Sequence, residues 1–188
     1  MQTVQLPPQP PRIHVSDEIF WELCQQNPEL KLERTATGEL IVNPPTGSET
    51  GSAKWDYGGQ LWFWNKQSGL GVGFDSSSGF TLPNGSTRSP DLSWIQKDRW
   101  EALSKSERER FAPIAPDFVL ELMSPNDPWG DARVKMQEYI ENGVRQGWLI
   151  YPRSKTIEIY RPEQPVQIVK IPCTLNGEDI LPGFKLEV

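Results

Sequence analysis

Alternating apolar and polar residues in the middle of the chain predict two strands that each carry an acidic side chain. In residues 89–95, Leu92 points to one face and Asp91 to the opposite face. In residues 117–123 the alternation continues, and Glu121 lies on the face opposite its two flanking leucines. Such an acid needs a partner, a proton or a cation, because burying an unpaired carboxylate costs several kcal/mol.

Capping residues and apolar spacing predict the remaining elements. The expected helices cover residues 16–27, 48–67, 97–111 and 131–142. Residues 30–34 and 39–43 bracket a turn and predict a hairpin, and further strands are expected within 71–96 and at 145–151, 156–161, 166–171 and 184–188. This order predicts an α/β fold, with a mixed β-sheet flanked by helices in a single domain.

Residues 1–14 are expected to form a proline-rich N-terminal arm, because prolines favour extended backbone and cannot enter a helix interior. The folded domain is therefore expected to cover residues 15–188. A chain of 188 residues with 23% charged and 36% apolar residues has the size and composition of one globular domain.

Membrane insertion and secretion are not expected. No stretch approaches the roughly 18 consecutive apolar residues of a membrane span, and the first residues lack the basic and apolar regions of a secretory signal. The two cysteines, Cys24 and Cys173, form neither a CxxC motif nor a disulfide framework. A cytoplasmic location is expected, since the cytoplasm keeps thiols reduced.

The single histidine restricts the chemistry that the chain could perform. His14 lies beside the proline-rich arm, which argues against two-histidine zinc hydrolases and against Ser-His-Asp or Cys-His catalysis. The net charge of −6 argues against bulk attraction to nucleic acid, so a nucleic-acid site would need local basic residues or a metal ion. Carboxylates, lysines, arginines and tyrosines remain as reactive groups, which points to a hard metal ion with oxygen ligands.

Lys135 completes a candidate site with the two acids. If the strands of Asp91 and Glu121 are neighbours, the carboxylates lie side by side, and a divalent ion between them would relieve their repulsion. Lys135 borders the apolar stripe of the next helix, from which it could reach over the carboxyl end of the Glu121 strand. Two acids on a metal and one lysine suit hydrolysis of a phosphodiester.

Each of these residues also has an ordinary structural interpretation. Asp91 could face solvent, Glu121 could pair with an arginine across the sheet, and Lys135 could pair with Asp131 four residues earlier. Glu33 alternates with leucines and is interpreted as a solvated strand residue.

Arg88 and the tryptophans also have two interpretations each. Arg88 could hold a phosphate or neutralise a charge on a strand. The tryptophans could stack on unpaired bases or pack in the core or an interface; they are Trp55, Trp62, Trp64, Trp94 and Trp148.

Longer motifs surround the candidate residues. Asp91 lies within RSPDLSW, Glu121 within PDFVLELMSP and Lys135 within KMQEYIENGV. Further blocks are PPTGSETG at 44–51, GFDSSSGFTLPNGSTRSPD at 73–91, GWLIYP at 147–152 and LPGFKLEV at 181–188. In these blocks the chain resembles the PD-(D/E)XK nuclease superfamily, and more closely its branch of restriction endonuclease-like proteins expanded in cyanobacteria. The likeness covers nearly everything from residue 16 to the end.

The resemblance implies a restriction endonuclease-like fold and a metal-dependent endonuclease that hydrolyses DNA. It implies Asp91 and Glu121 as ligands of Mg²⁺ or Mn²⁺, with the Leu122 carbonyl as a third ligand. Lys135 would then orient the attacking water. Glu49, which opens the long helix, matches an extra helical acid of the family, although dipole complementation explains an acid there equally well.

One departure from the superfamily pattern affects this assignment. The pattern has a lysine two residues after the strand acid, where this chain has Met123, so Lys135 on the following helix is the matching lysine. Two rivals remain open: a non-catalytic nucleic-acid- or protein-binding module that retains the fold, and a metal-dependent hydrolase of small phosphoesters. Nucleases that cut both strands commonly pair two active sites, so a homodimer is plausible, but the sequence does not decide this.

Overall fold

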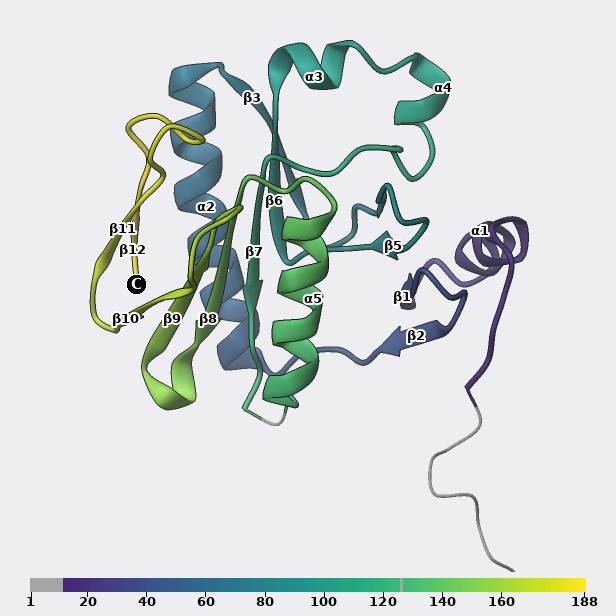
Figure 1. The fold of residues 1–188 in the computed structure, drawn as a ribbon, viewed down its shortest axis with the longest axis horizontal. Helices are drawn as coiled ribbons and strands as arrows, with labels where there is room; N and C mark the ends of the chain where they lie inside the picture. The colour runs from purple at the N-terminus through teal and green to yellow at the C-terminus, as the bar shows by residue number, and fades with distance from the viewer. Residues whose placement is uncertain (1–11, 126) are drawn as a thin grey trace, which may run out of the picture.

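A six-stranded mixed β-sheet is the main element of the computed structural model, which describes residues 12–125 and 127–188 (Figure 1). The strand order is β10-β9-β8-β7-β6-β3, and all neighbours are antiparallel except the parallel pair β7–β8. The strands are β3 (Gly71–Asp75), β6 (Leu92–Gln96), β7 (Phe118–Leu122), β8 (Gln146–Tyr151), β9 (Thr156–Tyr160) and β10 (Gln167–Lys170).

Two long helices cover opposite faces of this sheet. α2 packs Leu61 against the face that carries Phe118 and Trp148, together with the strands β11 and β12. α5 connects β7 to β8 and packs Met136 against the other face beside Val119; in Figure 1 it lies in front of the sheet, with α2 behind. The bounds are α2 (Ser48–Ser68), α5 (Trp129–Glu141), β11 (Thr174–Asn176) and β12 (Lys185–Glu187).

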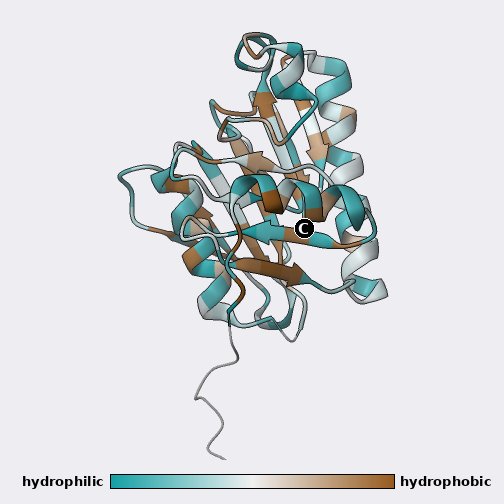
Figure 2. Ribbon diagram, turned by 90° about the vertical axis from the view of Figure 1, so that its right-hand side faces the viewer, coloured by the Kyte–Doolittle hydropathy of each residue, from teal (hydrophilic) through white to brown (hydrophobic). Residues whose placement is uncertain are grey.

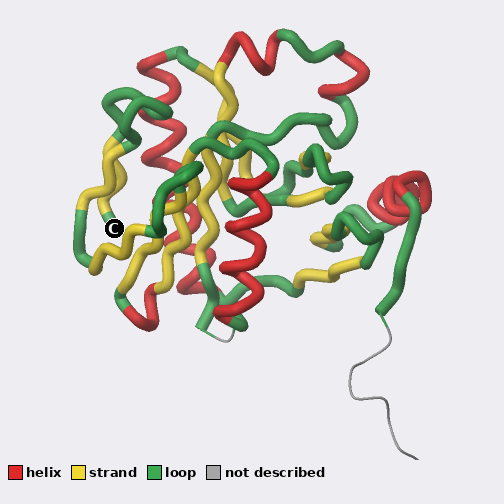
Figure 3. The backbone as a smooth tube through the Cα atoms, in the orientation of Figure 1, coloured by secondary structure: helices red, strands yellow, loops and turns green. Residues whose placement is uncertain are grey.

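A smaller four-stranded sheet lies beside the main one, with the order β2-β1-β5-β4. Figure 3 shows it next to α1, on the side of the molecule away from β10. Residues 89–91 connect β5 of this sheet to β6 of the main sheet, so the two sheets meet at that point. The bounds are α1 (Asp17–Gln26), β1 (Lys31–Arg34), β2 (Leu40–Asn43), β4 (Phe80–Thr81) and β5 (Thr87–Arg88).

The hydropathy of the elements follows this layering. Figure 2 shows hydrophobic residues concentrated on the strands and hydrophilic residues on much of the helices. The fully buried side chains include Phe118, Trp148 and Ile150 of β7 and β8, which are covered on both faces. The predicted α/β fold with a mixed sheet flanked by helices is confirmed.

Several predicted elements are confirmed with small shifts at their ends. Ser16 caps α1 by accepting the N–H of Ile19, and β1 and β2 form the predicted hairpin. α2 ends at Ser68 before Gly69, which has a left-handed backbone as expected of a C-terminal glycine. α5 begins two residues earlier than expected, at Trp129.

The prediction of one helix over residues 97–111 is wrong. The structure has two short helices there, α3 (Lys97–Glu101) and α4 (Lys105–Arg108). Ser104 has extended backbone and begins α4 with a capping box, in which Ser104 and Glu107 each accept a backbone N–H of the other residue. A serine of this kind starts a new helix because its side chain replaces the missing backbone partner.

The predicted N-terminal arm lies largely outside the described residues, which begin at Arg12. Within the described part, Arg12 pairs with Glu39 over 2.8 Å, and His14 forms a backbone bridge with the same residue. Among the described helices, none has the length and apolar character needed to cross a membrane.

Candidate active site

Asp91 and Glu121 lie opposite each other where β6 begins and the antiparallel strand β7 ends. β6 and β7 pair with Leu92 opposite Leu120, so the next position of the ladder places Asp91 opposite Glu121. The backbone N–H of Leu122 donates to Asp91 Oδ2 over 2.9 Å. The two acids are therefore neighbours, as expected. The alternative of a solvent-facing Asp91 is wrong, because its side chain is only 4% exposed.

Two lysines from different elements neutralise Asp91. Lys54 of α2 donates to Asp91 Oδ1 over 2.7 Å, and Lys31 of β1 donates to the same oxygen over 3.3 Å. Burial raises the pKa of Asp91, but the two ammonium groups and the backbone donor outweigh burial, so the pKa lies below its usual value. Asp91 is consequently an anion at neutral pH.

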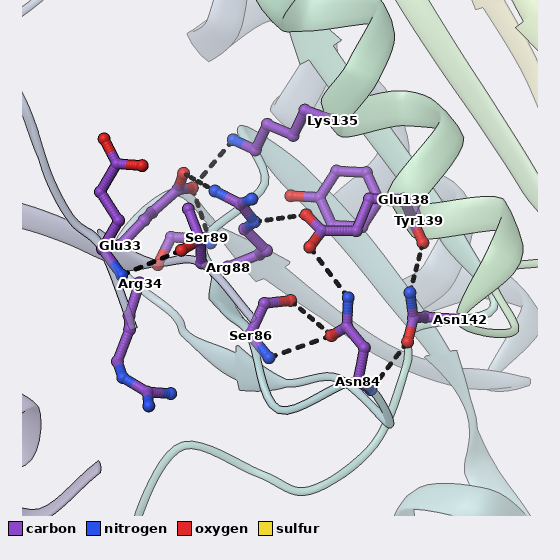
Figure 4. Close-up of polar contacts among 12 residues, drawn as sticks. Glu33, Arg34, Asn84, Ser86, Arg88, Ser89, Lys135, Glu138, Tyr139 and Asn142 are labelled. Carbon is purple, nitrogen blue, oxygen red and sulfur yellow. Dashed lines mark hydrogen bonds and ion pairs between the residues drawn. The ribbon is translucent and has the colours of Figure 1, made fainter. Parts of the chain in front are cut away.

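Lys135 joins Glu121 to a third acid, Glu33. The Lys135 Nζ atom lies 2.8 Å from Glu121 Oε1 and 2.8 Å from Glu33 Oε1, and Figure 4 shows the side chain extending from α5 toward Glu33. Burial lowers the pKa of Lys135, but the two carboxylates outweigh burial and hold it above its usual value. Lys135 therefore contacts these acids rather than Asp131, the alternative partner that the helical spacing suggested.

Glu33 is a member of the site that the sequence did not indicate. Its interpretation as a solvated residue is wrong, because its side chain is 3% exposed. Besides Lys135, it accepts the backbone N–H of Ser89 over 2.9 Å and contacts Arg88 over 3.4 Å. Burial raises the pKa of Glu33, but Lys135 and Arg88 outweigh it, so the pKa lies below its usual value. The alternation of apolar and polar residues along a strand is the same whether the polar face is exposed or covered by another element. No local feature of the sequence therefore identifies Glu33 as a buried residue.

Arg88 neutralises acids of the site. Its Nε donates to Glu138 Oε2 over 2.6 Å, and Figure 4 shows its guanidinium between Glu33 and Glu138. Asn84 donates to the other oxygen of Glu138 over 3.0 Å. Of the two roles left open for Arg88, the structure therefore supports the neutralisation of charge, here from two acids.

Glu121 has one carboxylate oxygen engaged and one available. Oε1 receives Lys135 and also the hydroxyl of Tyr139 over 3.0 Å, whereas no hydrogen bond from the described residues reaches Oε2. The side chain is 13% exposed. Burial raises the pKa of Glu121 above its usual value, although Lys135 opposes the shift. The hydroxyl of Tyr139 is a second contact of the site that the sequence pattern did not indicate.

The oxygen atoms at the end of β7 fit a small divalent ion. Carboxylates of Asp91 and Glu121 are hard ligands of the kind that Mg²⁺ and Mn²⁺ prefer. The N–H and C=O of one strand residue point to the same side of the strand, so the Leu122 carbonyl lies on the Asp91 side as well. Within the described residues no three acidic, histidine or cysteine side chains are grouped as metal ligands. The Leu122 carbonyl would add a backbone oxygen to the two carboxylates.

Glu49 lies apart from these side chains. It is exposed in the first turn of α2, and no hydrogen bond or ion pair of the described residues joins it to Asp91, Glu121 or Lys135. The turn before α2 nevertheless contacts the loop after β7, because the hydroxyls of Thr46 and Ser124 lie 2.8 Å apart. The role of Glu49 stays a prediction.

The tryptophans divide into buried and exposed groups. Trp94 and Trp148 belong to the core, and Trp64 packs partly buried against them. Trp55 and Trp62 of α2 are 85% and 61% exposed. Stacking on bases is therefore a hypothesis for these two exposed residues alone among the five.

The mixed sheet flanked by helices, with one acid before β6, another near the end of β7 and a lysine on the helix that follows, is of the restriction endonuclease-like class. The chain belongs to the family Uma2, described as "Putative restriction endonuclease", whose family model matches residues 17–188.

A solved structure shares the fold. It is described as the "Crystal structure of a putative nuclease belonging to DUF820 from Anabaena variabilis ATCC 29413", and it superposes with a TM-score of 0.69 at 22% sequence identity. The similarity covers 83% of this chain and 86% of that chain. A search of curated proteins found no significant match.

Proposed function

We propose that this protein is a metal-dependent endonuclease that hydrolyses phosphodiester bonds of DNA. The observation that carries the proposal is the convergence of Asp91, Glu121 and Lys135 at the carboxyl end of β7. These residues come from three separate segments of the chain. Their arrangement supports the proposal because this end of a strand is where α/β folds commonly gather ligands.

Asp91, Glu121 and the Leu122 carbonyl would hold Mg²⁺ or Mn²⁺. A divalent ion at this position supplies charge for the scissile phosphate and lowers the pKa of a bound water. Lys135 would act as a fixed cation, since its two carboxylate partners keep it protonated. It would orient the attacking water and stabilise the charge that develops on the phosphate.

The binding of Mn²⁺, measured by calorimetry, tests this assignment without knowledge of a target sequence. Wild-type protein is expected to bind Mn²⁺, and Asp91→Asn and Glu121→Gln are each expected to lose that binding, because an amide is a far weaker ligand than a carboxylate. Glu101→Gln is the matched control, since Glu101 is an exposed acid of α3 with a partner on its own helix.

Binding that persists in both Asp91→Asn and Glu121→Gln would contradict the metal site. Binding that appears only after a DNA duplex is added would support a site completed by the substrate phosphate. Circular dichroism of each variant checks that the fold is retained.

The alternative is a non-catalytic binding module that keeps the fold. The observation in its favour is that Asp91, Glu33 and Glu121 are each paired with a lysine or arginine, as in a purely structural charge cluster. Such a module would bind DNA or a protein equally well after Asp91→Asn. Loss of metal binding together with loss of cleavage in the same variant favours the endonuclease.

We also infer that the endonuclease acts as a homodimer in the cytoplasm. Exposed Trp55, Trp62 and Phe63 on α2 offer apolar surface of the kind found at protein interfaces, and the free Cys24 and Cys173 suit a reducing compartment. Light scattering of the purified chain is expected to give the mass of two protomers, and the mass of one protomer would contradict the dimer.

A further inference from the structure

Two lysines of the site share one carboxylate as their hydrogen-bond acceptor. Lys54 and Lys31 both donate to Oδ1 of Asp91, over 2.7 and 3.3 Å. Asp91 carries one negative charge, so two positive charges face one negative charge at this position. Elsewhere in the site, Glu33 and Glu121 share Lys135, and Glu33 is also paired with Arg88.

The two ammonium groups have donors to spare and belong to partly exposed side chains. Each ammonium carries three N–H donors, and among the described residues only Asp91 accepts from either group. The side chains of Lys31 and Lys54 are 28% and 22% exposed, whereas that of Asp91 is 4% exposed. Solvent can therefore reach both lysine side chains, whereas it barely reaches Asp91.

We propose that Lys31 and Lys54 form a phosphate-binding pair that contacts the DNA backbone beside the scissile phosphodiester. This inference rests on the proposed function and names the residues that would hold its substrate. A phosphodiester carries one negative charge and has two non-bridging oxygens. It would therefore balance the second ammonium charge and accept one hydrogen bond from each lysine.

The pair also explains how an acidic protein can bind DNA. The net charge of −6 provides no bulk attraction, so the positive charge has to be local. Lys31 belongs to β1 of the small sheet, and Lys54 belongs to α2, which covers the main sheet. Contact with the phosphate would therefore depend on two separate parts of the fold.

Asp91 links the phosphate pair to the metal. A cation at Asp91 Oδ1 would compete with both ammonium groups, so the lysines oppose metal binding while no phosphate is present. A bound phosphate would draw the lysines away and relieve that competition. Metal and DNA are therefore expected to favour each other's binding, and this coupling is reciprocal.

The experiment compares Lys54→Met with Lys66→Met, a lysine near the other end of the same helix. Without DNA, Lys54→Met is expected to bind Mn²⁺ about fivefold more tightly than wild type, because one competing cation is gone. With Ca²⁺ in place of Mn²⁺, its affinity for a DNA duplex is expected to fall. The slope of log affinity against log salt concentration is expected to decrease in magnitude by about one, as for the loss of one phosphate contact.

Lys66→Met is expected to match wild type in both measurements, and Lys31→Met to repeat the effects of Lys54→Met. Unchanged metal affinity and unchanged salt slope in both Lys31→Met and Lys54→Met would overturn the inference. Tighter Mn²⁺ binding with an unchanged salt slope would also overturn it, because the lysines would then contact no DNA phosphate. These outcomes can be told apart from failure of the proposed function, which appears instead as Mn²⁺ binding that survives Asp91→Asn.

Discussion

Glu121→Gln is expected to lower the rate of DNA cleavage by about a thousandfold, because the variant loses the charge on one of the two acids that would hold the metal. The amide side chain of this variant keeps an oxygen in the place of Oε1, so Tyr139 can still donate to it. The amide cannot supply the anionic second oxygen, Oε2, which no hydrogen bond from the described residues reaches.

The fold is expected to survive this change. Lys135 retains Glu33 as a partner at 2.8 Å, so no buried ammonium is left without an acid. Burial raises the pKa of Glu121, which means that the site already disfavours its charged form. A neutral side chain of the same shape is therefore tolerated, and the Tm is expected to stay close to that of wild type.

The measurement is nicking of supercoiled plasmid with Mn²⁺, followed over time for wild type, Glu121→Gln and the control Glu101→Gln. Cleavage by Glu121→Gln at the wild-type rate would remove Glu121 from the active site. Loss of cleavage together with a large fall in Tm would instead assign Glu121 a structural role.

Lys135→Met is expected to lower the free energy of unfolding by about 3 kcal/mol, because it leaves two buried acids without their shared cation. Glu33 is 3% exposed and Glu121 is 13% exposed, so water can replace the ammonium only in part. Arg88 remains near Glu33 at 3.4 Å, which keeps the loss below that of a fully unpaired charge.

Chemical denaturation of Lys135→Met and of the double variant Glu33→Gln with Lys135→Met measures this effect. The double variant is expected to regain part of the lost stability, because one of the two unpaired acids is then neutral. Cleavage is expected to remain lost in both variants. Lys105→Met serves as the control, since Lys105 is 85% exposed and pairs only along its own helix.

Equal stability of Lys135→Met and wild type would show that the acids do not depend on Lys135. A double variant less stable than Lys135→Met would show that Glu33 stabilises the fold mainly through Arg88 and Ser89 rather than through the lysine.

The strands and the faces on which the two acids lie could be predicted from the sequence because both depend on local rules, whereas the proximity of the acids was expected only if their strands were neighbours. The alternation with a period of two placed Glu121 on the opposite face from its leucines, and the pairing of β6 with β7 then placed Asp91 opposite it. The helix after β7 was recognisable by its apolar stripe, and Lys135 on its border by its position in that stripe. The division of residues 97–111 into two helices depended on the capping box at Ser104.

By itself, the sequence determined the α/β class, the main strands, the flanking helices and the strand faces of Asp91 and Glu121, since hydrophobic periodicity and capping act over a few residues. The pairing of β6 with β7, which places these two acids side by side, came from the structure. Only the tertiary structure decided which charges meet. Glu33 reaches Lys135 across 102 positions of the chain, and Lys31 and Lys54 reach Asp91 across 60 and 37. Ion pairs of this kind depend on how the small sheet, α2 and α5 pack together. That packing cannot be predicted from the residues adjacent to each charged residue in the sequence.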